Sequence, residues 1–226
     1  MKKLSVFLTG IVALVLISIT QVRAQESEPE SKFSAGADFY SNYVWRGSKL
    51  GIGPSFQPSV TFNTGGLTVG VWGAFDASGY TEVDPYISYS FPFGLSLGVT
   101  DYYSPDFMLF EKSTDTTGAH AVEINAGLSL GGFSLSANYI VNDAASLGVA
   151  GGDMYFQAGY DFKNLSIFVG AGDGWYTTDG EFNICNIGLG TSKEIKITDS
   201  FSVPVKGQVV LNPEREALYL VVGFSL

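Results

Sequence analysis

From Phe33 to Leu226 the sequence repeats one pattern, in which apolar and polar residues alternate for about ten positions and a turn-forming residue follows. A period of two places successive side chains on opposite faces of a β-strand. No apolar stripe with a helical period follows the N-terminal segment, so the sequence predicts an all-β fold. Twelve runs of this kind lie near residues 33–45, 56–63, 67–75, 82–91, 95–103, 121–130, 133–141, 153–162, 165–172, 182–191, 201–211 and 217–226.

The connections between the runs alternate in length. Short turns around Gly65, Pro92, Gly131 and Lys163 are typical of β-hairpins. Short turns on one rim and long loops on the other are typical of outer-membrane β-barrels. The link near residues 192–200 breaks this rule and is expected to be strand that extends past the membrane. The longer connections span residues 46–55, 76–81, 104–120, 142–152, 173–181 and 212–216.

The two faces of the predicted strands differ in charge. One face is apolar and uncharged within the runs, as in Ile87, Val99 and Ile124, whereas the other carries acids, amides, Ser and Gly. A basic residue that faces lipid at the membrane midplane costs about 2–4 kcal/mol. The uncharged face is therefore expected to meet lipid. The sequence predicts a transmembrane, antiparallel up-and-down β-barrel of about 12 strands, with ten or fourteen as alternatives.

The N-terminus has the pattern of a secretory signal peptide. Lys2 and Lys3 precede the apolar run Leu4–Ile19, and a small-residue cleavage pattern ends at Ala24. We expect residues 1–24 to be the signal, residues 25–31 an acidic disordered tail and residues 32–226 the barrel. A retained membrane helix is the alternative, but the run is shorter than the ~20 residues that a span needs.

Composition excludes several classes of function. Charged residues make up 15% of the chain, against about 25% in an average soluble domain. Removal of residues 1–24 would leave 9 basic and 22 acidic residues, a net charge of −13, which disfavours nucleic acid as a partner. With Cys185 and His120 as the only cysteine and histidine, no internal disulfide, metal site or cofactor is expected.

Aromatic residues at the ends of two runs suggest a membrane-interface belt. Tyr43 and Trp45 close the first run, and Trp175 and Tyr176 begin a long loop. Such side chains favour the boundary between hydrocarbon and water. If the apolar face meets lipid, Tyr43 and Trp45 lie on it where the strand leaves the membrane. Arg46 then has the opposite parity and points toward the mouth of the lumen.

Several of these residues resemble the TorF-like porin family, also called the Gcw_chp family of conserved hypothetical bacterial outer-membrane proteins. The likeness lies in Tyr43–Gly47, in Pro54 with Gln57, in Gly70–Trp72 and in Glu82–Tyr86, and beyond about residue 90 it is only architectural. After Arg46-Gly47 the chain has Ser48-Lys49-Leu50, where the family has a polar motif. The resemblance implies an outer-membrane barrel with a suspected pore, and it brings no substrate and no catalytic residue.

The polar face supplies candidate pore-lining residues. We expect them to form a constriction that weakly favours cations in a channel for passive diffusion of small solutes or ions. The equally weighted alternative is a static internal network that plugs a narrow barrel, because twelve strands lie between filled and open barrels. The candidates are Asp38, Arg46, Glu82, Asp84, Tyr86, Glu123 and Lys206.

The sequence is also compared with the requirements of an enzyme, a calcium site and a soluble carrier. A lipid-active barrel enzyme would need a base, but His120 lies at a loop–strand junction with no serine that the sequence places beside it, so no enzyme is predicted. Asp173, Asp179 and Glu181 do not have the spacing of a calcium loop and are expected to form an acidic solvated loop. The apolar loop 104–120 either folds inward or caps the barrel. A soluble secreted β-barrel carrier would show the same alternation with the apolar face turned inward.

Overall fold

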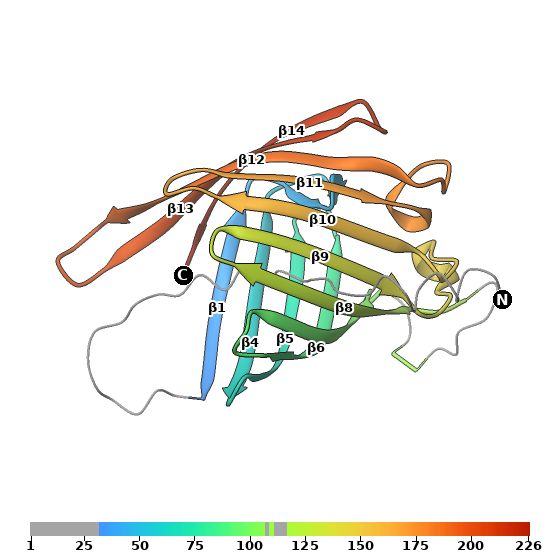
Figure 1. Ribbon diagram of the computed structural model, residues 1–226, viewed down its shortest axis with the longest axis horizontal. Coiled ribbons are helices and arrows are strands. Elements are labelled where there is room, and N and C mark those ends of the chain that lie inside the picture. The colour runs from blue at the N-terminus through green and yellow to red at the C-terminus, as the bar shows by residue number, and fades with distance from the viewer. Residues whose placement is uncertain (1–31, 107–108, 111–116) are drawn as a thin grey trace.

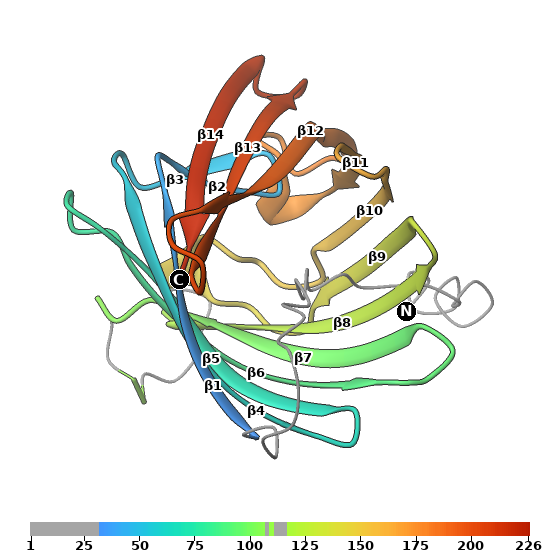
Figure 2. The ribbon, with the colours of Figure 1, turned by 90° about the vertical axis from the view of Figure 1, so that its left-hand side faces the viewer.

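The protein is a closed antiparallel β-barrel, seen in a computed structural model that describes residues 32–106, 109–110 and 117–226. Neighbouring strands form one ring, and the strand order is β1-β14-β13-β12-β11-β10-β9-β8-β7-β6-β5-β4 (Figures 1 and 2). Each strand therefore pairs with its sequence neighbour except at the closing seam and where β2 and β3 are left out. The strands of the ring are β1 (Phe33–Tyr40), β4 (Ser55–Thr64), β5 (Leu67–Asp76), β6 (Thr81–Ser90), β7 (Leu95–Tyr103), β8 (His120–Leu130), β9 (Phe133–Ile140), β10 (Met154–Asp161), β11 (Ser166–Gly172), β12 (Asn183–Lys196), β13 (Ser202–Asn212) and β14 (Ala217–Ser225).

These twelve strands confirm the predicted fold. The apolar residues of the alternating pattern are solvent-exposed on the outer surface, as Ile87 at 48% and Ile124 at 50% show. Their sequence neighbours on the other parity are buried, including Glu123 at 0% and Asn125 at 9%. An apolar outside around a polar inside suits a barrel whose wall faces hydrocarbon. The predicted segments 1–24 and 25–31 lie outside the described residues.

Among the described residues, no helix is long and apolar enough to cross a membrane. Two short 3₁₀ turns, η1 (Ala145–Leu147) and η2 (Gly174–Tyr176), lie in the long loops. The loop containing η2 places Tyr176 in the barrel interior, where its side chain is 2% exposed.

Aromatic pairs on the outer surface gather near the short turns. Tyr89, Phe91 and Phe93 follow one another at the β6–β7 turn, with ring centroids 4.9 and 5.5 Å apart. Tyr160 and Phe162 form a similar pair at the β10–β11 turn, with centroids 4.8 Å apart. Rings at this level match the aromatic girdle of membrane barrels.

The predicted extension between the tenth and eleventh runs is present. β12 pairs with β11 only as far as Gly190, but it continues along β13 to Lys196, which lies opposite Ser202. Figure 1 shows this pair of strands projecting beyond its neighbours. The β12–β13 ribbon is thus a two-stranded extension of the wall.

The first predicted run is wrong at its end. β1 ends at Tyr40, and Tyr43–Trp45 forms a separate short strand, β2, paired only with β3 (Ser48–Leu50). Ser41 and Asn42 make the break: Val222 N–H donates to Ser41 Oγ at 3.0 Å, and Asn42 donates to the Leu220 carbonyl at 3.1 Å. The chain leaves the wall here, and the β2–β3 hairpin lies inside the ring (Figure 2).

The pairing between β1 and β14 that closes the ring is short. β1 pairs with β14 through Asp38, Phe39 and Tyr40, and reciprocal backbone hydrogen bonds between Ala37 and Leu226 extend the contact. Phe39 stacks on Phe224 across this seam, with centroids 4.9 Å apart. The last run therefore closes the barrel, as its apolar alternation predicts.

Candidate lumen constriction

The tip of the β2–β3 hairpin is a two-residue turn made by Arg46 and Gly47. Both have positive φ angles, 48° and 84°, as a type I′ hairpin turn requires. A positive φ is uncommon for a residue with a side chain, so Arg46 holds a backbone conformation that the surrounding contacts must support. The tip is fixed by Asn212, whose amide donates to the Gly47 carbonyl at 3.0 Å.

A bulge in the wall receives this tip. The pairing of β11 with β12 shifts register after Gly170, so Cys185 is left without an opposite residue. As a result Cys185 and Asn186 both point inward and are buried. The backbone approach is so close that a Cβ on Gly47 would lie 1.8 Å from the Cys185 carbonyl oxygen. Only glycine fits at this point of the hairpin.

From the tip, the Arg46 side chain crosses the lumen to Glu123 on β8. The two Nη atoms of Arg46 donate to the two carboxylate oxygens of Glu123 at 2.5 and 2.9 Å. Glu123 also accepts from the Tyr102 hydroxyl at 3.0 Å, the Asn125 amide at 2.5 Å and the Tyr176 hydroxyl at 2.8 Å. The Glu123 side chain is fully buried, and its two oxygens accept every hydrogen bond named here.

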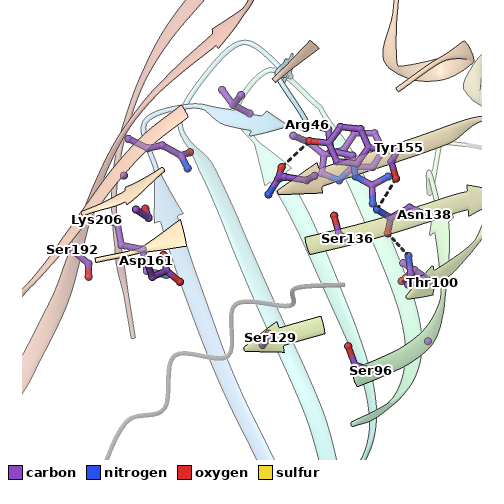
Figure 3. A pocket seen from close by; sticks show the side chains of 18 of the residues that line it. Arg46, Ser96, Thr100, Ser129, Ser136, Asn138, Tyr155, Asp161, Ser192 and Lys206 are labelled. Carbon is purple, nitrogen blue, oxygen red and sulfur yellow. Dashed lines mark hydrogen bonds between the residues drawn. The ribbon is translucent and has the colours of Figure 1, made fainter. Parts of the chain in front are cut away.

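Aromatic rings surround the guanidinium group. The Arg46 Cζ atom lies 4.7 Å from the ring centroid of Trp45, 4.6 Å from that of Tyr155 and 5.2 Å from that of Tyr176. Cation–π attraction is strongest where the cation has lost water, as at this buried site. We call Glu123, Tyr102, Tyr155 and Tyr176 the arginine cage (Figure 3 shows Arg46 beside Tyr155).

Arg46 stays charged and the Tyr176 hydroxyl stays neutral at this site. Burial is the largest single effect and lowers the pKa of Arg46, but the Glu123 carboxylate, Tyr102 and Tyr176 together outweigh it and raise that pKa well above its usual value. Burial raises the pKa of Tyr176 well above its usual value, and Glu123 adds to this rise against the opposing charge of Arg46. The Tyr176 hydroxyl therefore remains protonated and donates to Glu123.

The hairpin divides the lumen into two cavities. The inner cavity has a volume of about 1110 Å³ and runs from Arg46 and Tyr155 to the short-turn residues Phe91 and Lys163. The outer cavity, of about 480 Å³, lies on the long-loop side, where Lys49, Glu82 and Arg215 line it. Trp45 and Tyr102 border both cavities. The aromatic layer around Arg46 therefore separates an inner from an outer vestibule.

The remaining predicted polar residues also lie on the inner side of the wall, in separate groups. At the seam, Asp38 accepts a hydrogen bond from Ser225, and its carboxylate is 3.8 Å from the Lys206 ammonium. Lys206 also donates to the Tyr40 hydroxyl at 3.2 Å. Figure 3 shows Lys206 away from Arg46. Whether these side chains line a conducting path stays a prediction.

Glu82 and Asp84 form a second group on the outer-cavity side. Tyr80 donates to Glu82 at 3.0 Å, and the Tyr103 backbone N–H donates to Asp84 at 3.3 Å. Both carboxylates are buried, at 8% and 4% exposure. Tyr86, from the same strand, covers Gly70, where a Cβ would lie 2.6 Å from the ring.

The predicted interface belt is wrong for all four of its residues. Tyr43 and Tyr176 are buried at 8% and 2% exposure, and Trp45 packs against Trp175 with ring centroids 5.2 Å apart inside the barrel. For Tyr43 and Trp45 the physical reason is the break at Ser41 and Asn42, which turns the chain inward before the strand reaches Tyr43. Trp175 and Tyr176 lie inside because the loop after β11 returns into the barrel. Gly47, a residue type that commonly marks turns, lies between two strand-like triplets and is the signal that could have revealed this hairpin.

The rim residues His120 and Asp179 have ordinary ion-pair, stacking and hydrogen-bond partners. His120 pairs with Asp101 at 2.8 Å and stacks on Tyr103, with centroids 4.7 Å apart. Part of the loop 104–120, including Phe107 and Met108, lies outside the described residues. Asp179 accepts from the Glu181 backbone N–H at 3.0 Å. Within the described ranges, no group of three His, Cys, Asp or Glu side chains is placed to hold a metal ion.

Asp153, just before β10, is a buried acid that the sequence did not single out. It is 5% exposed, and its Oδ2 atom has no hydrogen-bond partner. Burial, and then the nearby Asp173 carboxylate, raise the pKa of Asp153 above its usual value. Asp173 instead accepts from the Met154 backbone N–H at 2.7 Å.

Comparison with known proteins gives only distant likenesses. The chain matches no protein-family description and no curated protein. A triple mutant of the Rhodopseudomonas blastica porin aligns with a TM-score of 0.41 and 13% identity, over 76% of this chain and 55% of the porin. Pseudomonas aeruginosa OprD aligns with a TM-score of 0.35 and 13% identity, over 86% of this chain and 66% of OprD.

The chain spans about half the length of the first of these porins, since the alignment covers 55% of it. Neither alignment is close enough to transfer a function. The resemblance to the TorF-like porin family is carried by the motif residues alone, and no family is assigned.

Proposed function

We propose that the protein is an outer-membrane channel for passive diffusion of small solutes or ions, with a lumen that weakly favours cations. The observation that carries this proposal is the inner cavity of about 1110 Å³, enclosed by a wall whose apolar residues point outward. A polar interior of this size inside an apolar barrel is the arrangement by which porins admit solutes. The partners are then outer-membrane lipids on the outside and small solutes within.

Two buried acids without a basic partner support a preference for cations. The four carboxylates predicted for the lumen lie on the inner side of the wall, and two of them, Glu82 and Asp84, have no basic residue among the hydrogen-bond and ion-pair partners described for them. Rings of acidic side chains favour cations in pores. Both acids are on the outer-cavity side, where Glu82 lines the cavity together with Lys49 and Arg215.

Conductance in planar bilayers tests the proposal. We expect the refolded protein to give discrete current steps with a modest cation preference, and Glu82→Gln with Asp84→Asn to reduce that preference. Asp199→Asn, on the exposed β12–β13 turn, is the control because it removes an acid outside the lumen. Complete absence of current from correctly folded protein would reject the channel, and unchanged selectivity in the double variant would reject the role of the two acids.

The second candidate is a closed barrel with a structural role. The specific observation in its favour is the Arg46–Glu123 pair, which crosses the lumen at 2.5 Å within an aromatic layer. A folded protein that is silent in bilayers and impermeable in liposome-swelling assays would favour this reading. In both cases the wall and the membrane location stay the same.

We propose no enzymatic activity. His120 is held between Asp101 and the Leu109 carbonyl, at 2.8 and 2.7 Å from its two ring nitrogens, and so has no free nitrogen to act as a base. A lipase assay on His120→Ala checks this. The outward apolar face also supports the membrane reading over a soluble carrier, and membrane fractionation separates the two.

A further inference from the structure

The arginine cage and its occupant belong to different parts of the chain. Glu123 and Tyr102 are on strands β8 and β7, Tyr155 is on β10, and Tyr176 is in the loop that follows β11. Arg46 is on the interior hairpin, which pairs with no strand of the ring. Three wall strands and one loop thus provide a complete set of partners for a guanidinium group, and the hairpin places the Arg46 guanidinium among them.

We propose that the arginine cage is a binding site for small guanidinium-bearing cations, and that Arg46 is its internal occupant. Such a cation would replace the Arg46 guanidinium, donate two parallel N–H groups to the Glu123 carboxylate and lie between the rings of Tyr155 and Tyr176. The inference names a solute class for the proposed channel and rests on that function for the route of the solute, whereas binding itself does not require conduction.

The chemistry of the cage selects a guanidinium over other cations. Two parallel N–H donors meet the two Glu123 oxygens at 2.5 and 2.9 Å, a fork that an ammonium group cannot make. The Tyr176 hydroxyl accepts from the same Nη1 atom at 2.8 Å while it donates to Glu123. Two ring faces within 4.6 and 5.2 Å suit a flat, weakly hydrated cation. A metal ion would find one carboxylate and no ring of oxygens.

Solutes can reach the cage from both sides. Arg46, Tyr102 and Tyr155 line the inner cavity, while Tyr102 and Tyr176 line the outer one. A small cation in either vestibule therefore meets a wall of the cage without any opening of the barrel.

Removal of the Arg46 side chain should empty the cage and leave the hairpin in place. The tip stays attached through the Asn212 amide and the Gly47 carbonyl. Trp45 still packs against Tyr102 and Trp175, with centroids 5.2 Å from each. Two of the three tryptophans of the chain, Trp45 and Trp175, therefore report on the site.

The test is chemical rescue of Arg46→Ala in detergent-refolded protein. Methylguanidinium is titrated, with methylammonium as the point-charge comparison, while tryptophan fluorescence and the thermal midpoint are recorded. We expect a saturable change in both signals in Arg46→Ala, with an affinity for methylguanidinium about tenfold above that for methylammonium, which corresponds to about 1.4 kcal/mol. Wild type should respond only at higher concentrations, because Arg46 competes for the cage. Lys193→Ala, which removes a basic residue from the exposed ribbon, should match wild type.

Two further variants secure the interpretation. Adding Glu123→Gln to Arg46→Ala should abolish the selectivity for methylguanidinium. If Arg46→Ala does not fold, Arg46→Lys keeps the charge without the fork, and it should bind methylguanidinium more weakly than an empty cage but more strongly than wild type.

Equal responses to the two cations, or none in a folded variant, would overturn the cage. Its failure is separate from that of the channel: current without binding overturns the cage alone, and binding without current overturns the channel alone.

Discussion

Strand β1 and the β2–β3 hairpin are neighbours in sequence but occupy different parts of the barrel. Both are short alternating segments rich in aromatic residues, yet β1 is a strand of the barrel wall and the hairpin lies in the lumen. In β1 the aromatic residue Phe39 packs on Phe224 at the seam. In the hairpin Trp45 packs on Trp175 and Tyr176 around a buried charge. The same residue type thus serves lipid contact in one place and interior packing in the other.

This difference shows that the alternation of apolar and polar residues alone does not distinguish a wall strand from an interior strand. A wall strand must find a hydrogen-bonded neighbour on each side, because lipid satisfies no backbone group. In the hairpin, β2 and β3 form hydrogen bonds with each other, and their remaining backbone groups need a polar lumen. Its identity is set by Ser41, Asn42 and the Arg46-Gly47 turn, not by its apolar content.

The largest expected effect comes from breaking the buried pair. Glu123→Ala leaves the Arg46 guanidinium buried without its carboxylate, and the free energy of unfolding should fall by about 3–5 kcal/mol. Arg46→Ala should cost less, since Tyr102, Tyr176 and Asn125 still donate to Glu123. Urea unfolding of the variants in lipid bilayers measures both values.

The double variant Arg46→Ala/Glu123→Ala should cost less than the sum of the single variants, because neither charge is then left alone. As a control, Lys196→Ala breaks an exposed 2.6 Å pair with Asp199 on the ribbon and should leave stability unchanged. Strict additivity of the two single effects would mean that the pair is not coupled, contrary to the geometry.

An arginine on the outside of the wall should behave in the opposite way to Arg46. Ile87 is 48% exposed on the outer face between Val69 and Val99, so Ile87→Arg should cost about 2–4 kcal/mol in a bilayer. Ser88→Arg, one residue on, faces the inner cavity and should cost much less. Refolding yield into lipid vesicles and urea unfolding compare the two. The reverse order would mean that the inside and the outside of the barrel had been exchanged.

Gly47→Ala should loosen the hairpin without touching its charge. The added methyl group meets the Cys185 carbonyl at 1.8 Å and adds strain at a φ of 84°, so a loss of about 1–3 kcal/mol and a larger conductance are expected. Gly131→Ala, at a φ of 60° with open space around it, is the matched control for backbone strain alone. Equal effects in the two variants would show that the tip does not rest against the bulge.

The smallest effect concerns Asp153, at the long-loop end of the wall. Its raised pKa means that the folded state holds the proton more tightly than the unfolded chain, whose aspartate pKa is about 3.9. Its favourable contribution is present below that value and is lost as pH rises through the higher folded pKa. Asp153→Asn should therefore flatten the pH dependence and stabilise the protein at neutral pH.

Thermal midpoints measured from pH 4 to 8 test this prediction. Asp179→Asn, an exposed acid in the following loop, is the control and should leave the profile unchanged. A wild-type profile that rises with pH over this range would contradict the sign.

The barrel could be predicted from sequence because lipid outside and polar groups inside impose a period of two on every wall strand. The same period placed Asp38, Glu82, Asp84 and Glu123 inside. It failed where the wall departs from regularity: the chain turns inward after Ser41, and the bulge at Cys185 shifts parity so that Ile184 faces outward.

The centre of the site could be predicted only in part. Arg46 and Glu123 were each expected in the lumen, but they are 77 residues apart, and no local pattern gives their pairing. Tyr176 and Trp175 belong to a loop whose return into the barrel depends on tertiary packing. Their aromatic character was equally consistent with a membrane boundary, so composition could not decide between the two.

Single-channel recording of wild type against a variant in which Gly-Ser linkers replace residues 43–50 tests the central claim most directly. The hairpin separates two vestibules of about 1110 and 480 Å³ inside an intact wall. We therefore predict that the variant still forms a folded barrel and conducts several-fold more current than wild type. A folded variant with the same conductance as wild type would contradict the account.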